Sequence, residues 1–289
     1  MNIRVVTVTG ADDSIRPEEL VAIAKDYPFV EFGILLSKKQ QGSKRFPSRN
    51  WWEELYILGR NEKLNLSGHL CGEWVRQLCL GVPSFFEDFG YTWKMFKRLQ
   101  LNFHAEHHTV DEKDFSDLIR RYLRDVPIIF QMDGVNEKIF FALVNRYGIV
   151  ALPLFDQSGG TGLLPGKWPK QYQYCGYAGG LSPDNLQQEL ESISKVASGP
   201  IWIDAETLLR SENDKVFDLE KVRCFLEAAK PWVKHTETEI KNTRQVRVLE
   251  YGRVRTLTEE ERRGLKKYTL RELNYPCCRK RDGLYIPED

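Results

Sequence analysis

A carboxylate followed by glycines is the feature of this sequence that points most directly to chemistry. An apolar run over residues 149–155 predicts a buried strand, and Asp156 follows it. Gly159, Gly160 and Gly162 come next. Their backbone amides can approach a ligand closely because no Cβ stands in the way. We therefore expect Asp156 to act as an acid or base beside a ligand that Gly160 helps to bind.

A second unit of this kind lies further along the chain. Residues 174–178 predict a short strand, and Gly179 and Gly180 follow it. Ser182 then predicts a helix N-cap, with Pro183 as the first helical residue. A helix N-terminus offers amide donors and a partial positive charge. We expect an anionic or strongly polar ligand group at the amides of Gly179, Gly180 and Ser182.

Histidines gather near two predicted strand ends. Four of the five in the chain, His69, His104, His107 and His108, lie there. Histidine exchanges protons near neutral pH, so His69 is a candidate catalytic base, with a structural role as the alternative. No spacing among them fixes a metal geometry, so we expect neither a metal nor a cofactor. The ligand-binding candidates at these and neighbouring strand ends are His104, Gln131 and Asp133.

These side chains need strands that end at one edge of a sheet. Eight short apolar runs predict such strands, at residues 3–9, 29–36, 64–67, 99–104, 127–132, 149–155, 174–178 and 200–203. Helical patterns lie between several of them, at residues 17–27, 115–122, 186–196 and 219–226. Residues 157–173 have no clear helical pattern. The alternation predicts an α/β fold, a (β/α)8 or TIM barrel, with an open doubly wound sheet as the alternative.

Composition limits the class of protein. The chain has 289 residues, 42% hydrophobic and 29% charged, which is enough for a large core. A formal net charge of +1 gives no argument for nucleic acid or an acidic membrane surface. Six cysteines without paired spacing favour free thiols in a reducing compartment. With no signal-peptide pattern, we expect a cytoplasmic protein without a membrane partner.

The end of the chain departs from the alternating pattern. We expect residues 1–232 to form the barrel and residues 233–289 to form a charged C-terminal extension packed on or beside it. The extension carries charges of both signs and ends in a basic run at residues 279–281. A solvated helical or hairpin extension is the interpretation we favour. A surface for nucleic acid or another partner is the alternative.

The order of the motifs resembles the phosphoribosylanthranilate isomerase family, TIM-barrel enzymes of the tryptophan pathway that perform an Amadori rearrangement. The resemblance spans roughly residues 3–232. It implies that Asp156 is the general acid and that Arg45 pairs with a ligand carboxylate. The segments that carry it are Val8-Thr9-Gly10, residues 32–37 and 43–48, Phe155-Asp156 with the glycines after it, Trp168, and residues 178–185.

Two places depart from the family pattern. Thr9 stands where the family has a cysteine as general base, and a hydroxyl cannot abstract a proton unaided at neutral pH. After the last strand, Asp204 and Glu206 stand where the family has its phosphate-binding serine and glycine pair. These two carboxylates lie two residues apart on an extended segment, so they should face the same side. We expect Glu206 to supply a replacement base, and Thr9 and Asp204 to contact the ligand.

The sequence thus predicts a divergent barrel that binds or acts on a sugar, a sugar phosphate or a nucleotide-like ligand. Whether it is an enzyme is left open. If it is one, we expect acid–base isomerisation with Asp156 as acid and Glu206 or His69 as base. One alternative is a non-catalytic protein that sequesters its ligand. Another is sugar chemistry on nucleic acid that uses the basic tail.

We predict that the protein does not replace phosphoribosylanthranilate isomerase in cells. Thr9 lacks the thiol base, and loss of a general base lowers a rate by ~10²–10⁴. The measurement is growth without tryptophan of a bacterial strain that lacks the isomerase and expresses this chain. The strain carrying a functional isomerase is the positive control. Robust growth with this chain would contradict the prediction.

Overall fold

The computed structural model describes residues 1–103, 109–132, 134–156, 158 and 161–233, together with four short strands between residues 247 and 287. The chain divides into two compact units, Met1–Lys234 and His235–Asp289. The first unit contains the eight parallel strands and the helices of the barrel. The second contains the four short strands. We describe each unit by itself.

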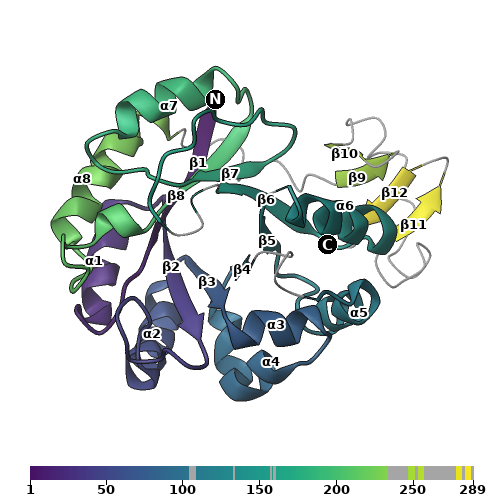
Figure 1. Cartoon of the computed structure of the whole chain (residues 1–289), viewed down its shortest axis with the longest axis horizontal. Coiled ribbons are helices and arrows are strands. Elements are labelled where there is room, and N and C mark those ends of the chain that lie inside the picture. The colour runs from purple at the N-terminus through teal and green to yellow at the C-terminus, as the bar shows by residue number, and fades with distance from the viewer. Residues whose placement is uncertain are drawn as a thin grey trace. The chain divides into compact units, whose positions relative to one another are not determined.

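The first unit is a closed barrel of eight parallel strands. Neighbours in the chain pair in order, and β1 also pairs with β8, which closes the ring (Figure 1). This confirms the predicted TIM barrel and excludes an open sheet. The strands are β1 (Asn2–Thr9), β2 (Val30–Ser37), β3 (Leu66–Cys71), β4 (Arg98–Asn102), β5 (Ile128–Gln131), β6 (Ala151–Asp156), β7 (Cys175–Ala178) and β8 (Pro200–Ala205).

Strand β3 lies later in the chain than residues 64–67, where we predicted it. Polar side chains at Ser67 and His69 interrupt the apolar run, yet both are buried, with 0% and 1% of their surface exposed. Alternate residues of β3 point into the barrel, so both side chains lie in its interior, where Ser67 Oγ and His69 Nε2 have no hydrogen-bond partner among the described residues. As a result His69 falls within the strand rather than after it.

Helices surround the barrel on its outer side. Those predicted from the sequence are present, and residues 161–174 contain no helix, as expected. Between β3 and β4 the chain forms two short helices. The α-helices are α1 (Pro17–Asp26), α2 (Arg49–Glu62), α3 (Glu73–Cys79), α4 (Ser84–Phe89), α5 (Glu112–Tyr122), α6 (Asn136–Tyr147), α7 (Leu186–Ser194) and α8 (Leu219–Ala229). Short 3-10 helices are η1 (Gly90–Met95), η3 (Thr207–Leu209) and η4 (Lys230–Trp232).

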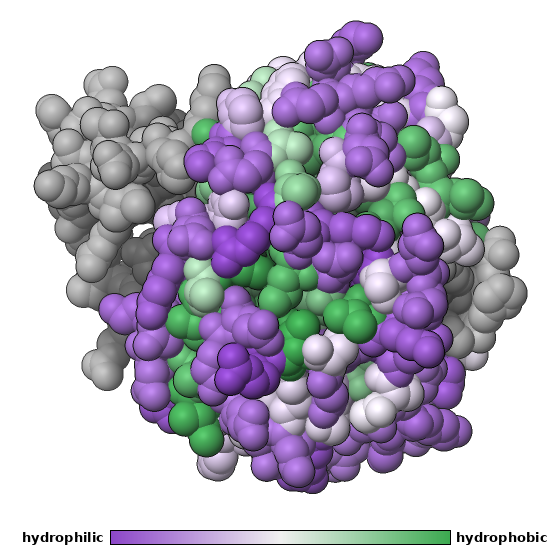
Figure 2. Space-filling view, turned by 90° about the vertical axis from the view of Figure 1, so that its left-hand side faces the viewer, coloured by the Kyte–Doolittle hydropathy of each residue, from purple (hydrophilic) through white to green (hydrophobic). Residues whose placement is uncertain are grey.

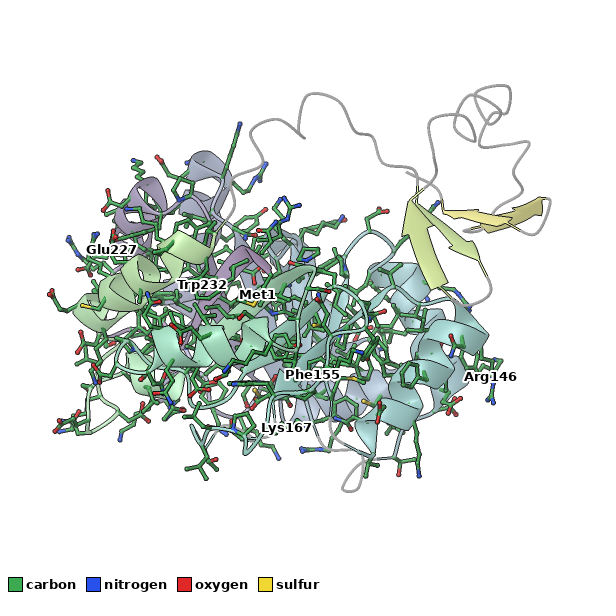
Figure 3. All side chains as sticks on the ribbon, turned by 90° about the horizontal axis from the view of Figure 1, so that it is seen from above. Met1, Arg146, Phe155, Lys167, Glu227 and Trp232 are labelled. Carbon is green, nitrogen blue, oxygen red and sulfur yellow. The ribbon has the colours of Figure 1, made fainter. Side chains whose placement is uncertain are left out.

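An apolar layer between the sheet and the helices forms the main core. Each helix turns a buried stripe toward the strands and leaves charged residues outside. Figure 3 shows Arg146 of α6 and Glu227 of α8 at opposite outer sides, with Phe155 of β6 between them. On the side that carries α1 and α8, hydrophilic side chains predominate (Figure 2). No helix among the described residues is long and apolar enough to cross a bilayer.

The interior of the barrel is divided between apolar and polar side chains. Side chains from β5 to β8 form a small apolar cluster of Ile129, Leu154, Ala178 and Trp202. The polar part contains Glu31 of β2 and Arg98 of β4, which are buried and form an ion pair. Because charges taken out of water need a partner, each of these two groups requires the other.

A glycine makes room for the largest side chain of this interior. Trp202 of β8 is fully buried and its indole lies against Gly176 of β7. A Cβ at position 176 would be 2.2 Å from the indole ring. The indole in turn packs on the Arg98 guanidinium, whose central carbon is 4.6 Å from the ring centroid. Gly176 therefore permits Trp202, which belongs to the apolar cluster, to pack on Arg98 of the polar part of the interior.

The second unit contains an antiparallel sheet with strand order β10-β9-β12-β11. The expected position of residues 233–289 on or beside the barrel stays a prediction. The strands are β9 (Arg247–Glu250), β10 (Arg253–Thr256), β11 (Cys278–Arg281) and β12 (Leu284–Pro287).

We predict that Gly176→Ala destabilises the barrel by about 3 kcal/mol, because the added methyl group overlaps the indole of Trp202. The measurement is the free energy of unfolding in urea. Gly166→Ala is the matched control, because nothing lies within 4 Å of a Cβ at that position. Equal stability of the two variants would contradict the prediction.

Candidate functional site

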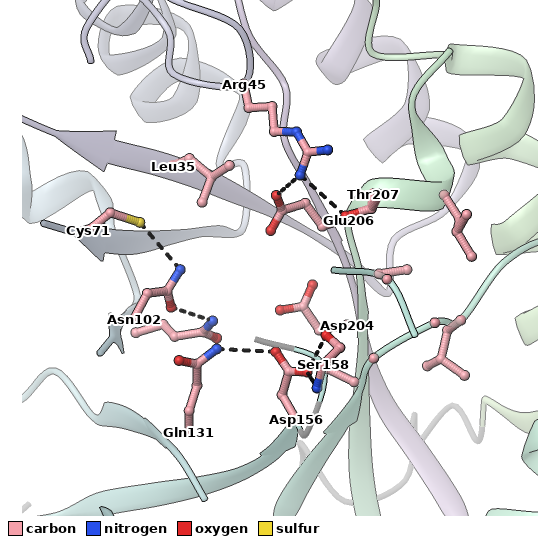
Figure 4. Close-up of a pocket in the computed structure, with 18 of the residues that line it drawn as sticks. Leu35, Arg45, Cys71, Asn102, Gln131, Asp156, Ser158, Asp204, Glu206 and Thr207 are labelled. Carbon is pink, nitrogen blue, oxygen red and sulfur yellow. Dashed lines mark hydrogen bonds and ion pairs between the residues drawn. The ribbon is translucent and has the colours of Figure 1, made fainter. Parts of the chain in front are cut away.

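A pocket of about 330 Å³ opens where the strands end (Figure 4). Five strands each contribute their final residue to its lining, and β8 contributes its last two. This is the edge at which TIM barrels bind ligands. The final residues of β3 to β7 in the lining are Cys71, Asn102, Gln131, Asp156 and Ala178.

Asp156 is held in place by three hydrogen bonds. Gln131 Nε2 donates to its Oδ2 over 3.1 Å. Ser158 donates to its Oδ1 from the backbone amide at 2.9 Å and from the hydroxyl at 2.7 Å. Both carboxylate oxygens thus act as hydrogen-bond acceptors. The geometry suits a group that accepts a hydrogen bond from a ligand hydroxyl.

Asp204 is a buried carboxyl group at the floor of the pocket. Its residue is 6% exposed, and its Oδ1 accepts a hydrogen bond of 2.7 Å from the Thr9 hydroxyl. Burial raises the pKa of Asp204 to about 8, helped by the nearby charges of Glu206 and Asp156 and opposed by the Thr9 hydrogen bond. Asp204 is therefore mainly protonated at pH 7, and can donate a proton.

Glu206 and Arg45 form an ion pair at the mouth. Arg45 Nη1 lies 2.7 Å from Glu206 Oε1 and also donates to the Thr207 hydroxyl at 3.2 Å. Burial raises the pKa of Glu206, while Arg45 lowers it and Asp156 raises it further. Figure 4 shows the second oxygen of Glu206 turned toward the pocket. This oxygen is available to a ligand.

Arg45 is paired with carboxylates of the protein. Its Nε is 3.0 Å from both oxygens of Asp214, and its backbone amide donates to Asp12 Oδ2 at 2.7 Å. We expected Arg45 to clamp a ligand carboxylate from the far side of the mouth. The structure instead places its guanidinium between Glu206 and Asp214, where it neutralises carboxylates of the protein itself.

Amide side chains line the opposite wall. Gln100 Nε2 donates to Asn102 Oδ1 at 2.9 Å, and Asn102 Nδ2 donates to the Cys71 sulfur at 3.4 Å. Burial raises the pKa of Cys71 to about 12, so the sulfur is a neutral thiol and not a nucleophile at pH 7. Amides donate and accept hydrogen bonds without charge, which suits ligand hydroxyl groups.

The charge of the lining disfavours an anion. Among the described residues, three carboxyl groups, Asp156, Asp204 and Glu206, face the pocket, and the guanidinium of Arg45 is the single cationic group in the lining. Arg45 is shared with Asp214, which lies outside the lining. A phosphate placed here would be repelled by at least Asp156 and Glu206.

The helix that we predicted to begin at Ser182 begins later. Helix α7 starts at Leu186, with Asn185 as its N-cap. Ser182 and Asn185 bond to each other, since the Ser182 amide donates to Asn185 Oδ1 at 2.8 Å and the Asn185 amide donates to Ser182 Oγ at 3.3 Å. These bonds form a turn, so the Ser182 amide is already satisfied. Ser182 does not belong to the pocket lining.

Gly179 and Gly180 do line the pocket, both with positive φ. The chain after β6 lies against them, because a Cβ at Gly180 would be 2.5 Å from the Leu164 nitrogen. A Cβ at Gly179 would be 3.2 Å from Asp156 Oδ1. These glycines therefore allow the loops to pack closely beside a carboxylate, a setting that opposes the expected anion site.

His69 and Thr9 lie below the pocket. Both are 1% exposed and neither is among the lining residues. Burial, with the nearby charge of Arg98, lowers the pKa of His69 to about 3, so its imidazole is neutral and a very weak base at pH 7. Thr9 acts on Asp204 through its hydroxyl. The structure thus gives neither residue direct access to a ligand in the pocket.

Three candidates, His104, Asp133 and Gly160, lie outside the described residues. Among the residues that are described, no group of three or more His, Cys, Asp or Glu side chains is arranged to hold a metal ion. Gln131, Asp156, Gly179, Gly180, Asp204, Glu206 and Arg45 come together in the lining.

Sequence reasoning missed the residues that support the site. Arg210, 1% exposed, donates to the Gly10 carbonyl, to Asp12 at 2.8 Å and to Asp214 at 2.6 Å. Nothing in the sequence separates this arginine from an exposed one. Gln100 could have been found, because Arg98, Gln100 and Asn102 alternate along β4 with the period of a strand face.

No family model matches the sequence, and a comparison with curated protein sequences gives no match. Among solved structures, phosphoribosyl anthranilate isomerase from Thermotoga maritima is 16% identical over 78% of this chain and 99% of its own, with a TM-score of 0.47. An AP endonuclease of family 2 from Brucella melitensis is 11% identical over 80% of this chain and 99% of its own, with a TM-score of 0.43.

A truncated 3-deoxy-D-arabino-heptulosonate 7-phosphate synthase from Thermotoga maritima is 11% identical over 80% of this chain and 86% of its own, with a TM-score of 0.45. Identities and TM-scores this low carry no argument about the site. They do not show membership of the isomerase family that the motifs suggested. The barrel itself rests on the strand pairing described above.

We predict that Asp204 makes the protein less stable as the pH rises. Its pKa is about 8 in the folded state and about 4 when unfolded, so the folded state binds more protons between these values. This contribution is fully present below pH 4 and is lost as the pH rises to 8, by on the order of 1 kcal/mol per pH unit. Asp204→Asn should lack it. The measurement is the unfolding free energy of both proteins from pH 5 to pH 8.

The exposed Asp184 provides the matched control, because Asp184→Asn makes the same change away from the pocket. Its stability should follow that of the wild type at every pH. Parallel curves for the wild type and Asp204→Asn would contradict the raised pKa.

Proposed function

We propose that this protein is an acid–base enzyme that isomerises a neutral sugar or a similar polyhydroxylated carbonyl compound. The observation that carries the proposal is the convergence of a protonated carboxyl group, Asp204, and two further carboxylates, Asp156 and Glu206, on one pocket. The reaction class is the one implied by the motif resemblance. The substrate we propose differs, because the described residues of the lining offer no free cation for a phosphate or carboxylate.

The ligand class follows from the hydrogen-bonding groups. Sugar hydroxyls both donate and accept, so they pair with carboxylates and with amides. The pocket offers Asp156 and Glu206 as acceptors, together with the side-chain amides of Gln100, Asn102 and Gln131. A volume of about 330 Å³ is the size of a small-molecule site. Apolar lining residues such as Phe46 and Phe103 can cover the carbon face of a sugar ring.

The roles of the carboxyl groups differ because their surroundings differ. We assign Asp204 as the proton donor, in place of Asp156, since Asp204 is the group that carries a proton at pH 7. Glu206 is the base, because burial raises its pKa and its second oxygen faces the ligand. Asp156, which accepts three hydrogen bonds, binds and orients a hydroxyl group.

The reaction balances with these groups alone. Glu206 removes a proton from the carbon next to the carbonyl group while Asp204 gives its proton to the carbonyl oxygen, which forms an enediol. In the second half, Asp204 takes back a proton from the neighbouring hydroxyl and Glu206 returns one to the former carbonyl carbon. No redox partner is needed. Arg45 keeps Glu206 in place throughout.

The test is exchange of carbon-bound hydrogen with solvent. We predict that the protein, in deuterated water with a panel of neutral pentoses and hexoses, introduces deuterium next to the carbonyl of at least one sugar. Glu206→Gln should slow this exchange by ~10²–10⁴. The measurement is proton NMR of the sugar. Asp184→Asn is the control and should keep the wild-type rate, because Asp184 is exposed and outside the lining.

Two further binding measurements with the same sugars distinguish an isomerase of neutral sugars from a sequestering protein and from a phosphate-binding protein. A sugar that binds in saturation-transfer NMR but never exchanges would favour a non-catalytic sequestering protein. The phosphate ester of any sugar that binds should bind at least ~10-fold more weakly, since two carboxylates repel it. Tighter binding of the phosphate, or binding of no sugar, would refute the proposal.

A further inference from the structure

Three exposed leucines lie at the mouth of the pocket. Leu163 is 68% exposed, Leu164 43% and Leu208 37%. We call these three residues the leucine rim. Single exposed leucines are common on protein surfaces, but a group beside a pocket commonly marks a binding surface. Whether the leucine rim is a binding surface therefore depends on its position relative to the pocket.

The backbone contacts place the rim against the pocket wall. The chain at Leu163 and Leu164 lies against Gly180, with the Leu163 carbonyl carbon 2.7 Å from where a Cβ of that glycine would be. One residue earlier, a Cβ at Gly162 would be 3.2 Å from the Thr207 Cβ. Gly162, Gly180 and Thr207 all line the pocket. The segment 162–164 thus lies between the chain after β7 and the chain after β8.

The rim continues the apolar side of the pocket. Leu208 belongs both to the lining and to the exposed surface. Ala178, Leu181 and Ala205 are further apolar residues of the lining. The lining also contains Leu35, Phe46 and Phe103, together with the carboxylates and amides proposed to bind hydroxyl groups. A ligand seated among the polar groups therefore has an apolar path from the pocket to the surface over Leu208.

We propose that the natural ligand is a sugar that carries an apolar substituent, an alkyl or aryl group, which lies on the leucine rim while the sugar occupies the pocket. The proposal rests on the proposed function, since it assigns the sugar to the same polar groups. Covering the exposed leucines removes apolar surface from water, which favours binding. A free sugar fills only the polar part of the site.

The experiment compares each free sugar with its octyl derivatives, substituted at the first or at the terminal carbon and used below their micelle concentrations. For a sugar that binds, one octyl derivative should bind about 10-fold more tightly or better, because burial of about two methylene groups suffices for that. The double variant Leu163→Ser/Leu164→Ser should bring the ratio of the two affinities toward one. Calorimetry measures both affinities.

Leu80→Ser is the matched control, because Leu80 is 47% exposed and is not part of the pocket or the rim. It should keep the wild-type ratio. Equal binding of free and octyl sugars, or a ratio that the double variant does not lower, overturns the proposal. Binding of no sugar in any form refutes the proposed function itself. Self-association of the wild type that the double variant abolishes, with a ratio of one, would assign the rim to a second copy instead.

Discussion

The ion pair between Glu31 and Arg98 is the interaction on which the interior of the barrel depends. Arg98 Nε is 3.0 Å from Glu31 Oε2, the Thr7 hydroxyl donates to Glu31 Oε1 at 2.9 Å, and the Trp202 indole covers the guanidinium. Loss of either charge would leave the other buried without a partner, which typically costs about 3–5 kcal/mol. A wholly apolar interior would not need this arrangement.

The same charges add to the effect of burial on the pKa values of His69 and Asp204. Arg98 adds to the burial that keeps His69 neutral, and Glu31 is among the charges that raise the pKa of Asp204. Below the pocket the barrel interior is shielded from water, so the buried carboxyl group of Asp204 keeps its proton. The raised pKa of Asp204, the proposed proton donor, is then a consequence of its depth in the pocket.

Much of the fold could be predicted from the sequence, because apolar runs alternate with amphipathic helices and Asp156 ends a strand. Strand β3 was less predictable, since the polar residues Ser67 and His69 interrupt its apolar run and are nevertheless buried inside the barrel. Site chemistry was harder still. Arg45 matched a family position, yet its partners Glu206 and Asp214 lie about 160 residues or more away in sequence, and no local pattern reports such pairs.

Arg210 connects the loop after the last strand of the barrel to the loop after the first strand. Its guanidinium binds the Gly10 carbonyl and Asp12, which follow the first strand, from a position just beyond the last strand. During synthesis, the loop after β1 emerges from the ribosome some 200 residues before its partner. Contacts so distant in sequence form late in folding. The mouth of the pocket is therefore completed only when the ring closes, so a nascent or truncated chain has no competent site to offer a ligand.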